Sequence, residues 1–192
     1  MAARVVSFIN LKGGVGKTTL ALAMGEFLAF WGLGQKVLLI DMDGQSNLSY
    51  ALLPTQTLEE IWEQGKSIYH MFRAALDGKI WDIEQAIIRD CSNIRGNTNL
   101  HAIVCSPSLG QLDEYILDLL ERRARIQVDF RWVLSEQLKK IKGRYDWIII
   151  DCPPSLSTVI SILFRLQPLY SLFYRVLHKS VLLFNQGLGE SF

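Results

Sequence analysis

The sequence predicts an α/β fold in which a mostly parallel β-sheet carries helices on both faces. Short apolar runs recur along the chain, at residues 5–9, 36–41, 100–105 and 147–151. Between them, apolar residues recur at the three- or four-residue spacing of amphipathic helices. Continuous apolar runs are typical of parallel strands buried on both faces, and their alternation with helices is typical of an open α/β sheet.

Composition agrees with a folded domain and says little about partners. The 192 residues are 49% hydrophobic, which argues against disorder, and the net charge of +1 indicates no strongly basic or acidic surface. The three cysteines, Cys91, Cys105 and Cys152, have neither C-x-x-C nor metal-ligand spacing, so we expect reduced, buried thiols. No signal peptide and no stretch of about 18 uncharged apolar residues is found, so we expect a cytoplasmic protein.

A glycine-rich loop separates the first strand from a helix expected over residues 18–31. Its residues are Lys12, Gly13, Gly14, Val15, Gly16, Lys17, Thr18 and Thr19. Glycines let backbone N–H groups turn toward phosphate oxygens, Lys17 can reach the terminal phosphates of a nucleotide, and the Thr18 hydroxyl can bind Mg²⁺. An ordinary turn with a solvated Lys12 is the alternative, and the strand–loop–helix context argues against it.

Acidic residues follow two of the other strands. The run 36–41 ends in Asp41, with Asp43 two residues later, and the run 147–151 ends in Asp151 before two prolines. Because the carboxyl ends of parallel strands meet at one edge of a sheet, these carboxylates should lie near the loop. Asp151 has the form of a Walker B acid, which holds Mg²⁺ through water. For Asp41 and Asp43 a simple strand-end turn is the alternative.

Together these segments resemble the ParA/MinD/Soj family of ATPases. The loop resembles the family's deviant Walker A motif, in which a second lysine, here Lys12, stands at the front; Leu11 replaces the first glycine of the general pattern. Residues 41–47 resemble the family's D-x-D-P-Q motif, except that Gly44 replaces proline, which we expect to leave this loop freer. Residues 151–154 resemble its D-x-P-P segment.

The resemblance implies a P-loop ATPase that uses ATP and Mg²⁺. It implies that Lys12 reaches across a dimer interface to the partner's nucleotide, that Asp43 orients or activates the attacking water, and that Asp41 lies behind the phosphates or metal. Lys12, Lys17 and Asp43 are thus the expected catalytic residues. The expected metal site comprises Thr18, Asp43 and Asp151. The expected cycle is ATP binding, homodimer formation, slow hydrolysis and release, stimulated by a ParB-like partner during plasmid or chromosome partitioning.

The middle of the chain offers no further chemistry. Residues 58–88 look helical and rich in aromatic side chains, and His70 is expected on a helix surface. Residues 109–142 predict two amphipathic helices. Basic runs at 122–125 and 139–144 are expected to be solvated helix faces; nonspecific DNA contact is the alternative.

The resemblance covers residues 4 to about 158, so we predict an ATPase domain over 1–158 and a divergent apolar tail over 159–192. Truncation or a shifted reading frame, leaving the sheet incomplete at its C-terminal edge, is the favoured interpretation of the tail. A membrane-facing segment, as in MinD-type members, is less favoured because Pro168 interrupts it. An unusual core helix with a strand near 181–184 is a third possibility. A noncatalytic truncated homologue that binds nucleotide weakly or serves as an interaction partner is the main functional alternative, and a MinD-like membrane-associated ATPase is another. An iron–sulfur reductase is disfavoured by the cysteine spacing.

Overall fold

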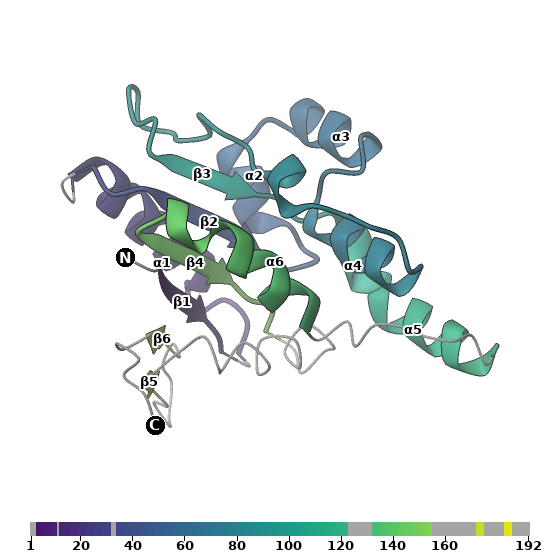
Figure 1. Ribbon diagram of the computed structural model, residues 1–192. Helices are drawn as coiled ribbons and strands as arrows, with labels where there is room; N and C mark the ends of the chain where they lie inside the picture. The colour runs from purple at the N-terminus through teal and green to yellow at the C-terminus, as the bar shows by residue number, and fades with distance from the viewer. Residues whose placement is uncertain are drawn as a thin grey trace.

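The central sheet contains four parallel strands in the order β1-β4-β2-β3 (Figure 1). The computed structural model describes residues 3–10, 12–31, 34–122 and 132–154, and two short strands at 172–174 and 183–185. The sheet strands are β1 (Arg4–Phe8), β2 (Val37–Asp41), β3 (Leu100–Ile103) and β4 (Trp147–Asp151). Each lies within one of the predicted apolar runs or overlaps it, and all three pairings are parallel, which confirms the predicted α/β fold.

Helices cover both faces of this sheet. On one face lie α1 (Lys17–Glu26), its π-helical continuation η1 (Phe27–Trp31) and α2 (Asn47–Leu52), whose buried residues share a core with Val6, Leu39 and Ile149. On the other lie α4 (Ile68–Leu76), α5 (Leu112–Glu121) and α6 (Val133–Ile141), packed on Val5, Ile40 and Ile148. The alternate residues of each strand therefore supply two separate cores, which explains why the strands are apolar throughout.

The helical region expected over residues 58–88 is three separate elements. They are α3 (Thr55–Glu63), α4 and the short 3₁₀ helix η2 (Ile83–Ala86). Gly65 and Gly78, with φ of 70° and 68°, follow the ends of α3 and α4 in the left-handed conformation that terminates helices. Helix α2 was not predicted. Further 3₁₀ turns are η3 (Pro107–Gln111), before α5, and η5 (Lys142–Arg144), after α6.

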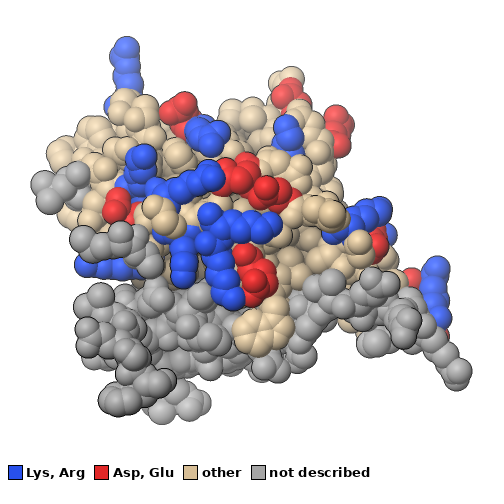
Figure 2. All heavy atoms as spheres, viewed as in Figure 1, with Lys and Arg blue, Asp and Glu red and all other residues tan. Residues whose placement is uncertain are grey.

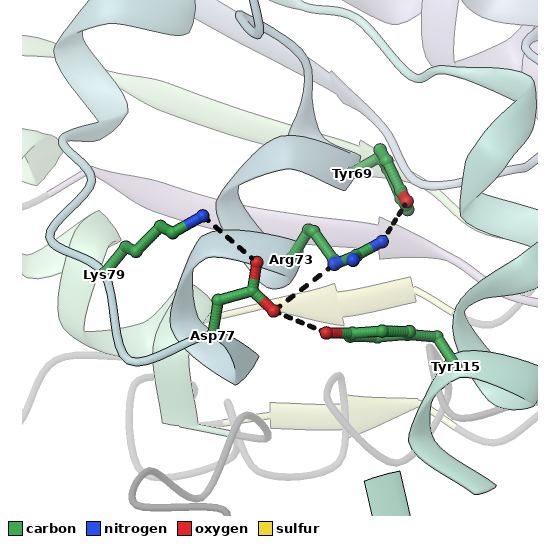
Figure 3. Close-up of polar contacts among 5 residues, drawn as sticks. All are labelled: Tyr69, Arg73, Asp77, Lys79 and Tyr115. Carbon is green, nitrogen blue, oxygen red and sulfur yellow. Dashed lines mark hydrogen bonds and ion pairs between the residues drawn. The ribbon is translucent and has the colours of Figure 1, made fainter. Parts of the chain in front are cut away.

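A polar cluster joins α4 to α5 (Figure 3). The Tyr115 hydroxyl donates to Asp77 Oδ1 at 2.5 Å, and the Arg73 guanidinium lies over the Tyr115 ring at 3.6 Å. Arg73 and Lys79 each approach Asp77 at 3.4 Å, and Arg73 also donates to the Tyr69 hydroxyl. These contacts fix α5 against α4. The first turn of α5 adjoins the site described below.

Basic side chains on the face seen in Figure 2 lie among acidic ones. Within the run 139–144, Lys139 pairs with Glu136 at 2.6 Å and Arg144 with Glu84 at 2.7 Å. These pairs agree with the solvated face expected for the run 139–144, whereas residues 123–125 of the other basic run lie outside the described residues. The cysteines Cys91, Cys105 and Cys152 are free and buried, as expected.

The tail predictions fall mostly outside the described residues. Strands β5 (Leu172–Tyr174) and β6 (Leu183–Asn185) form an antiparallel pair, and β6, which overlaps the strand expected near 181–184, lies beside β1. Among the helices that the structure describes, none combines the length and hydropathy needed to cross a membrane.

Candidate functional site

The carboxyl ends of three strands meet at one edge of the sheet. Asp151, at the end of β4, pairs in register with Phe8 of β1 and with Asp41 of β2. The glycine-rich loop leaves β1 there, and Asp43 follows β2. The parallel register therefore gathers the loop and the acidic residues at one place, as the sequence predicts.

The loop forms an open cradle at the start of α1. Gly14 and Gly16 have φ of 70° and 84°, a left-handed backbone that other residues adopt at a cost. A Cβ added at Gly13, Gly14 or Gly16 would meet nothing within 4 Å, so the space beside the loop is open. Because α1 begins at Lys17, its first-turn N–H groups and its positive dipole end adjoin this space. The arrangement suits an anion such as phosphate.

The pocket beside the loop has a volume of about 470 Å³. Its lining includes all of the predicted loop residues except Lys12, and also Asp43. The full lining is Gly13, Gly14, Val15, Gly16, Lys17, Thr18, Thr19, Asp43, Gln45, Asn47 and Pro154. Gln45, Asn47 and Pro154 lie within the motifs recognised in the sequence, but nothing in the sequence assigned them a position facing the pocket.

The two lysines of the loop lie in different environments. The Lys17 residue is only 7% exposed and lines the pocket. Lys12 is exposed and does not line it; its backbone N–H donates to Asn10 Oδ1 at 2.9 Å. The chain therefore offers its own pocket one lysine and presents the other outward.

Asp151 is a buried carboxylate near Thr18 and Lys17. The residue is 1% exposed, and among the described residues neither of its carboxylate oxygens has a hydrogen-bond partner. Burial raises the pKa of Asp151 to about 6, while the Thr18 hydroxyl and the Lys17 ammonium nearby oppose that shift. A buried carboxylate with free lone pairs beside a threonine hydroxyl fits Mg²⁺, a hard cation that keeps several of its waters.

The described protein groups alone do not form a metal cage. Among the described residues no group of three or more His, Cys, Asp or Glu side chains is arranged to hold an ion. A bound Mg²⁺ would therefore take most of its ligands from water and from phosphate oxygens, as is usual for this ion at nucleotide sites.

Asp41 is an anchor for the backbone and does not line the pocket. Its Oδ1 accepts from the N–H of Asp43 at 3.0 Å, and its Oδ2 accepts from the N–H and the hydroxyl of Ser49 at 2.9 and 2.7 Å. Burial nevertheless raises the pKa of Asp41 to about 7. No sequence motif identified Ser49, because its hydrogen bonds to Asp41 form only in the folded chain.

Asp43 lies on a loop that packs closely against η3. The Asp43 side chain accepts from the N–H of Gln45 at 3.0 Å. A Cβ added at Gly44 would lie 3.0 Å from the backbone nitrogen of Gly110 and 3.3 Å from its Cα. Gly44 was expected to free this loop; in the structure, glycine also allows the loop to approach η3, where a larger residue would displace backbone.

A second pocket, of about 320 Å³, lies on the other side of this loop. It shares Asp43, Gln45 and Pro154 with the pocket beside the glycine-rich loop, which we call the phosphate pocket. It continues to η3 and the first turn of α5. Movement of the loop would therefore alter both pockets at once.

Ser46 strains the same loop, and we expect its replacement by glycine to stabilise the protein. Ser46 has a left-handed φ of 56°, and its buried hydroxyl has no nitrogen or oxygen partner among the described residues, only the weakly hydrogen-bonding thiol of Cys105 nearby. Both features cost free energy, so Ser46→Gly should raise the free energy of unfolding by about 1 kcal/mol. Urea denaturation would measure it.

Ser67→Gly is the matched control for that measurement. Ser67 also precedes a helix, but its φ is −106° and its hydroxyl bonds to His70 at 2.8 Å. This variant should be destabilised. A lower stability of Ser46→Gly would contradict the expected gain.

One known protein family matches most of the chain. The family described as an AAA domain matches residues 3–165. The chromosome-partitioning ATPase Soj of Treponema pallidum is 31% identical over 80% of this chain and 49% of its own length. The chain thus spans about half the length of this curated relative.

Two solved structures resemble the fold. A putative plasmid partition protein from Borrelia burgdorferi B31, bound to AMPPNP, aligns with a TM-score of 0.63 at 25% identity, over 85% of this chain and 60% of that one. Cobyrinic acid a,c-diamide synthase from Mycobacterium smegmatis, with a bound ATP analogue and magnesium, aligns with a TM-score of 0.61 at 26% identity, over 83% and 53%. Both neighbours were solved with an ATP analogue.

Proposed function

Because this chain belongs to the ParA/MinD/Soj family of ATPases, we propose that it is an ATP-hydrolysing dimerisation switch that serves plasmid or chromosome partitioning. One observation carries the proposal: a single open pocket is lined by a glycine loop, the buried Lys17 and Asp43, with the unpaired carboxylate of Asp151 beside it. These groups suit a nucleoside triphosphate and its metal.

Each group in the pocket has a distinct part in the proposed reaction. The backbone N–H groups of the loop and of the first turn of α1 bind phosphate oxygens, and Lys17 offsets charge that develops on the terminal phosphate. Thr18 and Asp151 would hold Mg²⁺, Asp151 through water. When bound, the ion neutralises phosphate charge. Asp43 faces the same pocket and would orient the attacking water by accepting its hydrogen bond.

The dimer and its partners complete the proposal. Lys12 is exposed and does not line its own pocket, so it is available to contact the nucleotide of a second copy. A second cation near the terminal phosphates would favour the ATP-bound dimer, and hydrolysis would remove that advantage. A ParB-like partner that stimulates hydrolysis belongs to the same proposal.

ATP turnover by the purified chain tests the catalytic part. We expect Lys17→Ala to reduce turnover at least about a hundredfold and to weaken ATP binding, because the pocket loses its buried cation. Lys139→Ala removes the same charge from the solvent-exposed face of helix α6 and should leave turnover unchanged.

Two outcomes would count against the proposal. Equal turnover in Lys17→Ala and the unmodified chain would mean that the activity does not arise in this pocket. Binding of ATP without turnover in either would favour a noncatalytic nucleotide binder.

A further inference from the structure

The two ends of the loop that carries Asp43 are both hydrogen-bonded to one carboxylate, that of Asp41. Asp41 accepts hydrogen bonds from both ends of the segment 43–49: from the N–H of Asp43 on one oxygen, and from the N–H and hydroxyl of Ser49 on the other. The N–H of Ser46 also donates to the Asp43 carbonyl at 2.7 Å, within the same segment. The position of the Asp43 backbone therefore depends on how firmly Asp41 is held.

The Ser49 hydroxyl links this closed loop to the end of β3. It donates to Asp41 and at the same time accepts from the N–H of Cys105 at 2.9 Å, a contact between residues 56 positions apart. Asp41, Ser49 and Cys105 are all buried, so water cannot readily replace a lost bond. A serine hydroxyl is suited to this part because it donates one hydrogen bond and accepts others.

The loop thus has two connections to the segment that follows β3. One is the Ser49 hydroxyl at Cys105, and the other is the close approach of Gly44 to Gly110. Both lie outside the phosphate pocket, since neither Ser49 nor Cys105 lines it. They act on the position of Asp43, whereas most of the residues that line the phosphate pocket belong to the separate glycine-rich loop.

We propose that Ser49 is a positioning residue for ATP hydrolysis, which holds Asp43 in place through Asp41 and the end of β3 without touching the nucleotide. This inference rests on the proposed function. It requires that loss of the hydroxyl slow the chemical step while leaving nucleotide affinity nearly intact, because misplacement of a catalytic group by about 1 Å can cost about a hundredfold in rate.

Steady-state kinetics and nucleotide binding test the proposal. Ser49→Ala should lower kcat about tenfold or more, with the dissociation constant for ATP changed less than threefold. Ser49→Thr keeps the hydroxyl and should recover most of the rate. Ser67→Ala, which also removes a buried, hydrogen-bonded serine hydroxyl at the start of a helix, should leave kcat unchanged.

A double variant separates positioning from general destabilisation. If Ser49 acts only through Asp43, Ser49→Ala should have no further effect on kcat in an Asp43→Ala background. Independent, multiplying effects of the two substitutions would overturn the proposal, as would a kcat of Ser49→Ala equal to that of the unmodified chain.

Hydrogen exchange gives a readout that does not depend on turnover. Ser49→Ala should accelerate exchange in the peptide spanning 42–49, and Ser67→Ala should not. Unchanged exchange in that peptide would overturn the positioning role. Absence of ATP turnover by the unmodified chain would instead contradict the proposed function, and the exchange rates would still decide whether Ser49 holds the loop.

Discussion

Replacement of Lys12 by glutamine is expected to abolish ATP-dependent dimer formation while ATP binding is retained. Lys12 is exposed and does not line its own pocket, whereas Lys17 and Thr18, which do, are untouched by the change. A lysine that contacts phosphate across an interface is desolvated there, and removing one partner of such a charged pair typically costs about 2–5 kcal/mol. Since about 1.4 kcal/mol corresponds to a tenfold change, the dimer should weaken at least about thirtyfold.

Light scattering with a slowly hydrolysed ATP analogue would measure this effect, and fluorescence of a labelled nucleotide would report binding. Lys139→Gln is the matched control, because it removes an exposed lysine far along the chain and should leave the dimer intact. A dimer that survives in Lys12→Gln would refute the cross-subunit role. Loss of nucleotide binding would instead place Lys12 in its own subunit's site.

The strands and the location of the site were predictable because their signals are local. Strand β4 spans residues 147–151, where the apolar run predicts it, since a strand buried on both faces must be apolar at every position. The parallel order then brings Asp151 next to Asp41 in register. Strand ends that carry acids or a glycine loop therefore mark the edge where a ligand binds.

Helix boundaries in the middle of the chain were less predictable. Apolar residues continue at helical spacing through 58–88, but Gly65 and Gly78 interrupt the helices there with positive φ. Tertiary packing then places α4 against the sheet. Helix α2 escaped prediction because it follows an unusual left-handed serine, Ser46, which has no side-chain capping bond.

The contacts that fix the candidate site are long-range, and sequence patterns do not report them. The Ser49 hydroxyl meets the backbone of Cys105, and Gly44 meets the backbone of Gly110. Neither pair has a spacing or composition that marks it in the sequence. Asp41 shows the consequence: its motif implies a place behind the phosphates or metal, and only the structure reveals that its carboxylate binds the backbone of the loop that follows.

Replacement of Asp43 by alanine is expected to trap the ATP-bound dimer. Asp43 is 9% exposed and faces the phosphate pocket, while the groups proposed to bind phosphate lie on the separate loop at 12–19. Loss of a group that orients water typically slows hydrolysis by about 10²–10⁴-fold. Because hydrolysis is what dissolves the proposed dimer, a slow variant should remain dimeric in ordinary ATP.

Phosphate release and light scattering on the same samples would test both parts of this expectation. Asp118→Ala removes a carboxylate from the partly exposed face of α5 and should behave like the unmodified chain. Unchanged phosphate release from Asp43→Ala would require another group to place the water. Slow phosphate release without a persistent dimer would show that hydrolysis and dimerisation are independent. The loop at 43–49 would then control only the chemical step, and the state of the nucleotide would not control the dimer contact proposed for Lys12.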